Sequence, residues 1–181
     1  MEQLQRSPVI ASIKDESGLK KVLESDCLVV FILYGSILNI DSIVKRVKDS
    51  GRMAFIHIDL IDGFSPKDVC IDYIAEHTEA DGILSTRTNI VRHAREAGLI
   101  AIQRFFLLDS ISLNNILRQP LKADLIDVMP GVMPGVIRYL TKKTHRPIMA
   151  SGLISTKKDI ISALSAGAFA ISTTREDLWD S

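Results

Sequence analysis

Short apolar runs and amphipathic segments alternate along this chain of 181 residues, and no other feature constrains its fold as strongly. Eight apolar runs recur at intervals of about 23 residues, which is tight but sufficient for a strand, a helix and short loops. Most of these runs are apolar at consecutive positions, as in parallel strands that are covered on both faces. The expected strands comprise residues 9–13, 28–33, 53–59, 81–85, 99–106, 125–129, 148–150 and 168–172.

A strict alternation of strands and helices predicts an α/β fold with a parallel sheet and right-handed crossovers. Eight strands favour closure into a compact (β/α)8 barrel of the TIM type, with an open sheet as the alternative. We expect residues 1–181 to form this single domain. Only seven residues follow Thr174, which is too few for a full eighth helix. The last helix is therefore expected to be truncated or missing, and apolar surface around Leu178 and Trp179 is a candidate homodimer contact.

Capping residues mark several expected helix ends. Ser65 is expected to cap a helix that has Pro66 at its first position. Asp109 or Ser110 is expected to cap the helix that Pro120 terminates. These signals place the helix starts after the expected strands, where a barrel of this kind carries its functional loops.

The overall charge and the absence of long apolar runs exclude several classes of partner. Because 22 basic residues balance 22 acidic ones, any binding of nucleic acid requires a local basic patch. No apolar run is long enough to span a bilayer and no signal peptide is visible, so a cytoplasmic protein without a membrane partner is expected. Cys27 and Cys70 are expected to be reduced core thiols. No metal-ligand spacing recurs, and neither a metal nor another cofactor is expected.

Two loops near the end of the chain predict a phosphate site. The apolar runs 148–150 and 168–172 stop at small polar residues, and the first leads directly into an expected helix. Free backbone N–H groups beside a helix start bind phosphate, and the loops after the last two strands of such barrels often do so. The candidate phosphate ligands are Ser151, Gly152, Leu153, Ser172 and Thr173. The alternative is that these are ordinary turn and cap residues.

A second polar cluster runs from His57 to Gly63. If residues 53–59 form one strand, His57 and Asp59 share a face and point into the barrel. We favour an interpretation in which Asp59 binds ligand hydroxyls, with a catalytic base, a metal-binding pair or a satisfied polar core pair as the alternatives. The candidate residues for ligand hydroxyls or for the pocket wall are Lys14, His57, Asp59, Asp62, Arg104, Asp127 and Gly131.

The same carboxylates raise the alternative of an enzyme, a sugar-phosphate isomerase or epimerase. Such an enzyme requires an acid–base pair, for which Asp59 and Asp127 are the only good candidates. The seventh strand ends in Ala150, Ser151 and Gly152 and offers no second acid. We therefore assign no catalytic residue and expect a protein that binds a small phosphorylated ligand without acting as an enzyme.

Basic side chains on one expected helix and the loop before it are candidates for RNA contact. Arg92 and Arg95 are three residues apart and close in sequence to Arg87, which suits an exposed patch. Other basic positions on expected helices, including those at 142–146, are expected to be solvated faces. No RNA-recognition motif and no stacking platform is evident in the sequence.

Motifs distributed over essentially the whole chain, in order, resemble those of the glycerol uptake operon antiterminator family, which responds to glycerol 3-phosphate. The matching segments are Ile10–Asp15, His57–Gly63, Gly82–Thr86, Gln103–Ser110, Asp127–Gly131, Pro147–Ile154 and Ala170–Thr173. The resemblance implies a cytosolic barrel that senses glycerol 3-phosphate. It also implies action on the leader mRNA of glycerol-utilisation genes, where the protein prevents premature transcription termination.

The resemblance also implies roles for individual residues. Gly152, Ser172 and Thr173 would hold the phosphate. Asp59 and Lys14 would meet the glycerol hydroxyls, and Asp127 with Gly131 would shape the pocket. A sugar-phosphate isomerase or epimerase, and a phosphate-ligand sensor without RNA binding, remain the alternative functions.

Ser151 departs from the pattern of the family, in which a glycine is expected at this position. If the position requires a positive φ, the added side chain compromises ligand fit. If it does not, the hydroxyl of Ser151 supplies an additional hydrogen bond.

Overall fold

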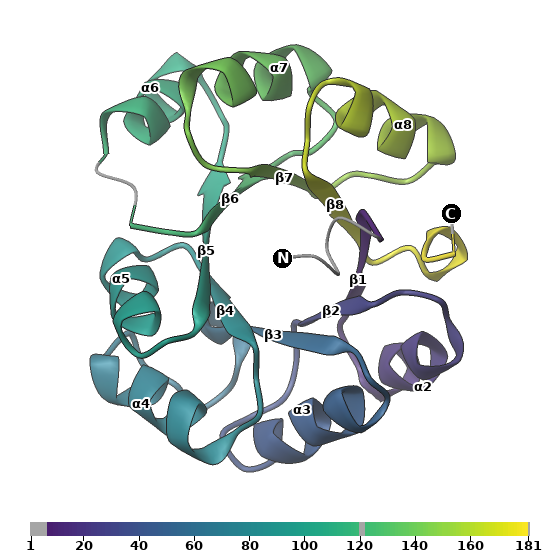
Figure 1. The fold of residues 1–181 in the computed structure, drawn as a ribbon, viewed down its shortest axis with the longest axis vertical. Coiled ribbons are helices and arrows are strands. Elements are labelled where there is room, and N and C mark those ends of the chain that lie inside the picture. The colour runs from purple at the N-terminus through teal and green to yellow at the C-terminus, as the bar shows by residue number, and fades with distance from the viewer. Residues whose placement is uncertain (1–6, 120–121, 181) are drawn as a thin grey trace.

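A closed barrel of eight parallel strands forms the centre of the computed structural model, which describes residues 7–119 and 122–180 (Figure 1). Each strand is hydrogen-bonded to the next along the chain, and β8 returns to β1. The strands are β1 (Val9–Ile13), β2 (Val29–Ile32), β3 (Met53–His57), β4 (Gly82–Ser85), β5 (Ile100–Phe106), β6 (Leu125–Met129), β7 (Ile148–Ser151) and β8 (Ala170–Thr173). The predicted TIM-type barrel is therefore confirmed, and the open sheet is excluded.

The helices form a ring around the strands (Figure 1). They are α2 (Glu16–Glu24), α3 (Ile40–Asp49), α4 (Asp68–His77), α5 (Thr88–Glu96), α6 (Ser110–Arg118), α7 (Pro134–Lys143) and α8 (Lys157–Ser165), with 3-10 turns η1 (Ile58–Leu60) and η2 (Glu176–Leu178). Asp109 caps α6, because its carboxylate accepts a hydrogen bond from the backbone N–H of Ser112. The terminating role predicted for Pro120 concerns a residue outside the described ranges. No helix in those ranges has the length and apolarity that crossing a membrane requires.

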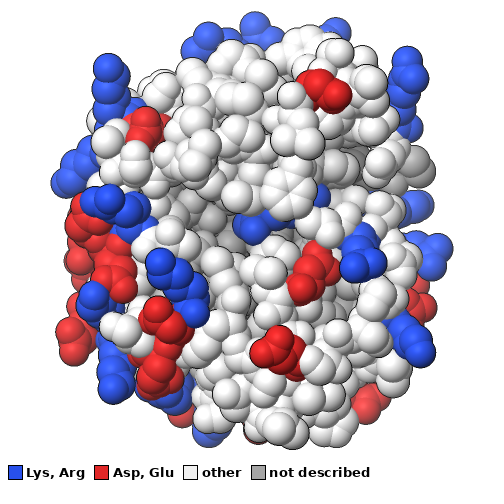
Figure 2. Space-filling view, turned by 180° about the vertical axis from the view of Figure 1, so that it is seen from behind, with Lys and Arg blue, Asp and Glu red and all other residues white. Residues whose placement is uncertain are grey.

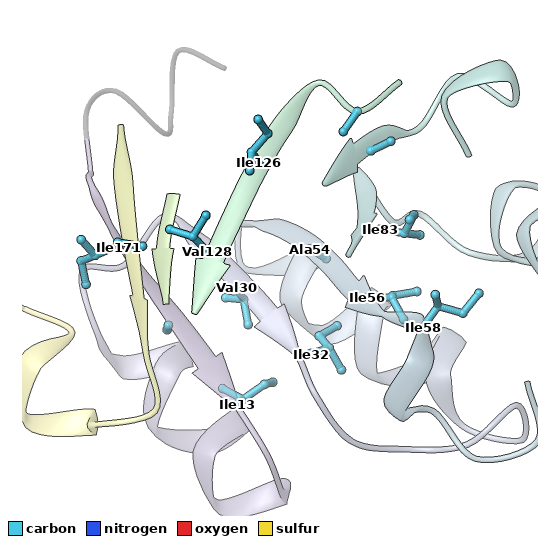
Figure 3. Packing of buried hydrophobic residues seen from close by; sticks show 14 of the residues in the cluster. Ile13, Val30, Ile32, Ala54, Ile56, Ile58, Ile83, Ile126, Val128 and Ile171 are labelled. Carbon is cyan, nitrogen blue, oxygen red and sulfur yellow. The ribbon is translucent and has the colours of Figure 1, made fainter. Parts of the chain in front are cut away.

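Two layers of apolar side chains explain why the strands are apolar at consecutive positions. One layer fills the barrel and includes Ile10, Phe31 and Phe55. The other lies between the strands and the surrounding helices, and Figure 3 shows members such as Ile32 and Ile56 on neighbouring strands. Each fully buried side chain of this size stabilises the fold by about 1.5–3 kcal/mol. The inner layer contains no bulky residue at the carboxyl ends of β7 and β8, which leaves room for polar groups there.

Strand β3 ends two residues earlier than predicted, at His57. Asp59 lies in η1, because its carboxylate accepts hydrogen bonds from the Ser85 hydroxyl at 2.7 Å and from the Thr86 backbone N–H at 2.7 Å. These donors lie at the end of the neighbouring strand and draw the chain out of the β conformation. The expectation that His57 and Asp59 share one face of a continuous strand is therefore wrong.

Helix α4 begins at Asp68, three residues after the predicted cap at Ser65. The carbonyl oxygen of Ser65 accepts a hydrogen bond from the N–H of Lys67, and the Ser65 hydroxyl lies 3.6 Å from Cys70 Sγ. The hydroxyl is thus engaged by a thiol rather than by a helical N–H group. Both Cys70 and Cys27 are buried and free, as expected for core thiols.

The prediction that no full eighth helix follows β8 is confirmed for the described residues, but the prediction of exposed apolar surface there is wrong. The 3-10 turn η2 takes the place of an eighth helix, and Leu178 and Trp179 are only 4% and 3% exposed. The indole Nε1 of Trp179 donates a hydrogen bond of 3.0 Å to the Thr173 carbonyl oxygen. This hydrogen bond and the burial of both apolar side chains stabilise the turn against the barrel beside β8.

Candidate functional site

A small polar pocket lies at the carboxyl ends of the strands, where β7 and β8 meet β1. Figure 2 shows this face of the molecule, with Lys or Arg atoms in a depression near its centre. The cavity is about 100 Å³, several times the space that one water molecule requires. Its lining residues are Ser12, Leu33, Arg104, Met129, Ser151, Gly152, Leu153, Ile154, Ser172, Thr173 and Thr174. The structure therefore brings together all five predicted phosphate ligands.

The loop after β7 presents backbone N–H groups to this pocket. Gly152 has a φ of +76°, and Leu153, with a φ of +61°, is the one non-glycine residue of the described ranges in the left-handed region. Strained backbone of this kind occurs where a loop clamps a ligand. Within residues 7–119 and 122–180, no hydrogen bond uses the backbone N–H of Gly152, Leu153, Ile154 or Thr174. Four donors thus remain available to an anion.

The start of α8 is not part of this set of free donors. Thr156 caps the helix, and its hydroxyl accepts a hydrogen bond from the N–H of Asp159. The Asp159 carboxylate in turn accepts hydrogen bonds from the backbone N–H groups of Ser155 and Thr156 at 3.1 Å and 2.9 Å. Because this carboxylate already occupies the helix terminus, the available N–H donors belong to the loop that precedes it.

A chain of polar side chains forms the floor of the pocket. The Ser151 hydroxyl donates a hydrogen bond to Asp127 Oδ1 and lies 2.9 Å from the Ser172 hydroxyl. The Ser12 hydroxyl donates to Ser172 over 3.2 Å. Since each hydroxyl carries one hydrogen, Ser12 donates to Ser172, Ser172 to Ser151, and Ser151 to Asp127. All three hydroxyl dipoles are therefore oriented toward one buried carboxylate.

Arg104 balances the charge of this carboxylate. Its Nε lies 2.6 Å from Asp127 Oδ2, and Arg104 is 7% exposed while Asp127 is fully buried. Burial raises the pKa of Asp127, an effect that Arg104 and Ser151 oppose. In the described part of the chain, no hydrogen bond uses the terminal nitrogens of Arg104. Their N–H groups can donate to an anion in the pocket.

The serine found where the family pattern suggests glycine fits this site without backbone strain. Ser151 is absent from the residues with positive φ, so a side chain is tolerated at this position. Its hydroxyl supplies the link between Asp127 and Ser172. Of the two consequences considered from the sequence, the structure therefore shows an additional hydrogen bond.

His57 is also buried in the barrel interior, but it does not line the pocket. Burial and then the nearby positive charge of Arg104 lower the pKa of His57 from 6.5 to about 4. Its Nδ1 has no hydrogen-bond partner among the residues that the structure describes. The imidazole is accordingly neutral at physiological pH and adds no positive charge beside Arg104.

The remaining candidate pocket residues are placed differently. Asp59 lines a separate small cavity, where burial raises the pKa of its carboxyl but the hydrogen bonds from Thr86 and Ser85 outweigh this and lower it. Asp62 is exposed in the loop after η1, and Lys14 is exposed just after β1. Neither of these two lines the phosphate pocket.

Gly131 couples the loops after β6 and β7. Its N–H donates a hydrogen bond of 3.0 Å to the Gly152 carbonyl oxygen, and an added Cβ would lie only 2.8 Å from the backbone N of Ser151. Only glycine allows the two loops to approach this closely. Gly131 therefore shapes the pocket from outside its lining.

Each of the three arginines predicted to contact RNA lies beside an acidic side chain. The closest approaches are 3.8 Å for Arg87 to Asp59, 3.9 Å for Arg92 to Glu96 and 3.1 Å for Arg95 to Asp124. These acids offset the positive charge of the predicted patch. The structure therefore does not present α5 as a basic surface.

Ser12, which was not among the predicted site residues, completes the row of hydroxyls under the pocket. In β1, Ile10 and Ser12 occupy alternate positions, and Ile10 belongs to the layer inside the barrel. Because side chains two positions apart on a strand share a face, this spacing could have predicted that Ser12 points into the barrel. In the ranges described, no three His, Cys, Asp or Glu side chains cluster as a metal site would require.

A family model and two solved structures identify the family of this chain. The model of the family described as glycerol-3-phosphate responsive antiterminator matches residues 9–179. An uncharacterized Escherichia coli (strain K12) protein, YgcP, is 42% identical over 178 residues, which cover 97% of this chain and 93% of that protein. The crystal structure of a glycerol uptake operon antiterminator regulatory protein from Listeria monocytogenes is 31% identical, with a TM-score of 0.90 and 94% of each chain covered. A glycerol uptake operon antiterminator-related protein from Thermotoga maritima is 29% identical, with a TM-score of 0.86, covering 97% of this chain and 99% of that one.

Proposed function

Because this chain belongs to the glycerol-3-phosphate responsive antiterminator family, we propose that it binds glycerol 3-phosphate and regulates transcription of glycerol-utilisation genes. The ligand occupies the pocket beside β7 and β8. The ligand-bound protein then contacts leader mRNA and prevents premature termination. Such a regulator acts in the cytoplasm and needs no cofactor.

The observation that carries this proposal is the set of unused donors around the pocket. The free N–H groups of Gly152, Leu153, Ile154 and Thr174 are joined there by the terminal nitrogens of Arg104. Backbone N–H groups and a guanidinium together suit a phosphate dianion, because each supplies a hydrogen bond toward negative charge. The phosphate end of the ligand therefore belongs against the loops after β7 and β8.

The floor of the pocket suits the hydroxyl end of the same ligand. The hydrogens of Ser12, Ser172 and Ser151 are directed toward Asp127, so the hydroxyls turn acceptor lone pairs outward. An alcohol of the ligand can donate to these oxygens, whereas a phosphate oxygen cannot. This polarity supports a ligand that combines phosphate with hydroxyl groups.

The geometry does not favour a sugar-phosphate isomerase or epimerase. Asp59 accepts three hydrogen bonds and lines a cavity separate from that of the phosphate site. Asp127 is fully buried and bonded to Arg104 and Ser151. Two carboxylates engaged in this way, one beside a separate cavity and the other buried outside the lining of the phosphate pocket, are poorly suited to transfer protons on one substrate.

Thermal unfolding with added ligand tests the first half of the proposal. A ligand present at 100 times its Kd stabilises the folded state by about 2.7 kcal/mol, which corresponds to a rise in Tm of roughly 5–10 °C for a chain of this size. Glycerol 3-phosphate should produce this rise, while glycerol and inorganic phosphate at equal concentration should produce much smaller ones. An unchanged Tm with glycerol 3-phosphate would contradict the assignment of the pocket.

Binding to RNA tests the second half. Fluorescence anisotropy with the leader transcript of a glycerol-utilisation gene should show binding that strengthens on addition of glycerol 3-phosphate. Thermal stabilisation without any RNA binding would reduce the protein to a sensor of a phosphorylated ligand.

A further inference from the structure

The charge of this neutral chain is unevenly distributed along its length. Residues 15–96 contain 14 acidic and 10 basic residues, whereas residues 110–147, which include α6, α7 and the loops that follow them, contain 6 basic and 2 acidic ones. One of those two acids, Asp127, is buried and bonded to Arg104, and the other, Asp124, is paired with Arg95. The outer surface of α6, α7 and the loops that follow them is therefore basic.

Basic residues at helix ends often have a purely local role, because they complement the helix dipole. Helices α2, α3 and α5 also end in basic residues, but each of these has an acidic partner. The pairs are Lys21–Glu176, Lys48–Asp81 and Arg95–Asp124. At the ends of α6 and α7, by contrast, no salt bridge within the described ranges involves Arg118, Lys142 or Lys143.

The basic residues continue beyond the helices that they follow. Arg146 comes after the last residue of α7 and lines three grooves of about 540, 630 and 420 Å³. Lys143 and Arg146 line one of these grooves together with residues at the end of α6. Arg146 also lines another groove, together with Arg95 and Asp124. The grooves therefore lie among the ends of α5, α6 and α7, at the end of the barrel where β5, β6 and β7 begin.

An exposed aromatic ring lies within this basic surface. Tyr139 is 42% exposed, and Lys142 and Lys143 follow it by three and four residues on α7. At this spacing the three side chains share one face of the helix. A ring between positive charges provides stacking for an unpaired base together with phosphate contacts, which is how single-stranded RNA is commonly held.

We propose that this surface, which we call the α6–α7 face, contacts the single-stranded part of the leader RNA; the proposal rests on the proposed function. The α6–α7 face comprises Arg118, Lys122, Tyr139, Lys142, Lys143 and Arg146. It lies at the opposite end of the barrel from the phosphate pocket, so RNA and ligand bind without competing for space. Charge complementarity favours RNA over an acidic protein here, because the α6–α7 face combines cations with the exposed aromatic ring of Tyr139.

A charge-matched pair of variants tests this surface. The first is the triple variant Lys142→Gln/Lys143→Gln/Arg146→Gln. The second, Lys20→Gln/Lys45→Gln/Lys67→Gln, removes three charges from the other half of the molecule. Affinity for the leader transcript should fall at least tenfold in the first variant and less than threefold in the second. The slope of log K against log salt should decrease by about 2 in the first variant, since each lost contact to single-stranded RNA contributes about 0.7.

Two further measurements separate the surface from the function. Tyr139→Ala should weaken RNA binding at unchanged salt dependence, because stacking releases no counterions. All variants should keep the rise in Tm with glycerol 3-phosphate, which shows that the barrel and the pocket are intact. If the wild type binds the transcript and the first triple variant binds equally well, the α6–α7 face is excluded while the proposed function stands. If the wild type binds no RNA, this proposal fails together with the RNA-binding half of the proposed function, while the rise in Tm still decides the ligand-binding half.

Discussion

Arg104 Nε lies 2.6 Å from Asp127 Oδ2, and both side chains are buried where the barrel opens toward the phosphate pocket. The pair neutralises two charges that would otherwise be costly to bury. It also leaves the terminal nitrogens of Arg104 free for a ligand, so one residue serves both the fold and the site.

Replacing Arg104 with methionine should therefore destabilise the protein and abolish ligand binding. Asp127 would remain buried without its counter-charge, at a cost of about 3–5 kcal/mol. Urea denaturation should show this loss, and glycerol 3-phosphate should no longer raise the Tm. The double variant Arg104→Met/Asp127→Leu should recover much of the stability but none of the ligand response. Arg175, which forms an exposed ion pair with Asp177, provides the control, because Arg175→Met should leave the urea midpoint unchanged. A ligand response in the double variant would contradict the role of Arg104.

Ser151 links the buried carboxylate to the row of hydroxyls, and Ser151→Ala should break this link. Asp127 loses a hydrogen bond that Ser151 donates, and such bonds to charged groups contribute about 1.5–3 kcal/mol. Removal of the neutral bond from Ser12, in Ser12→Ala, should cost less, about 1 kcal/mol. Urea denaturation of both variants measures the difference. Equal losses would mean that the orientation of the hydroxyls toward Asp127 is not what stabilises the floor of the pocket.

Gly152→Ala should damage the phosphate cradle itself. The position has a φ of +76°, and an added Cβ would lie 2.5 Å from Met129 Cε. The strain should cost about 1–2 kcal/mol, and the displaced loop should weaken glycerol 3-phosphate binding at least tenfold in calorimetry. Gly135→Ala is the matched control, because its Cβ would meet nothing within 4 Å and the site lies in α7. This control should stabilise the protein slightly, by about 0.5–1 kcal/mol, and leave binding unchanged.

The fold could be predicted from the sequence because its signals are local and repeated. Eight apolar runs and the amphipathic segments between them suffice to define the order of strands and helices. The errors occurred where a long-range contact overrides a local signal. Ser65 has the sequence context of a helix cap, yet its hydroxyl faces Cys70. Exposed apolar surface was predicted at Trp179 because no local sequence pattern indicates that its indole Nε1 donates a hydrogen bond to the Thr173 carbonyl oxygen.

The same distinction holds for the candidate site. The loops containing Gly152 and Thr173 were predictable, because their position after the last two strands follows from the order of elements. The hydrogen bond from Ser151 to Asp127 was not predictable, because it depends on the register in which β6 pairs with β7. Asp59 was misplaced because the donors that capture it come from the end of the next strand.

The buried His57 should make stability depend on pH in a defined range. The unfolded chain binds a proton below the usual pKa of 6.5, while the folded protein resists it until about pH 4. The free energy of unfolding should therefore fall as pH decreases from 6.5 to 4, by about 1.4 kcal/mol per pH unit or roughly 3 kcal/mol in all. Above pH 6.5 this contribution is constant. Urea denaturation at a series of pH values should show the slope in the wild type and a much smaller one in His57→Leu. The exposed His145 supplies the control, and His145→Gln should retain the full slope.

The last turn of the chain should contribute to stability as an eighth helix would. Trp179 is 3% exposed, so Trp179→Ala should cost about 3–5 kcal/mol through the lost contacts and the cavity. Trp179→Phe keeps most of the ring volume but removes the hydrogen bond to the Thr173 carbonyl oxygen, and should cost about 1 kcal/mol. Because Thr173 also lines the phosphate pocket, Trp179→Ala should weaken glycerol 3-phosphate binding more than Trp179→Phe does. Urea denaturation and calorimetry measure the two effects separately. A loss below 1 kcal/mol in Trp179→Ala would show that the turn does not cover the barrel, and the surface beneath it would again be a candidate contact between two copies of the chain.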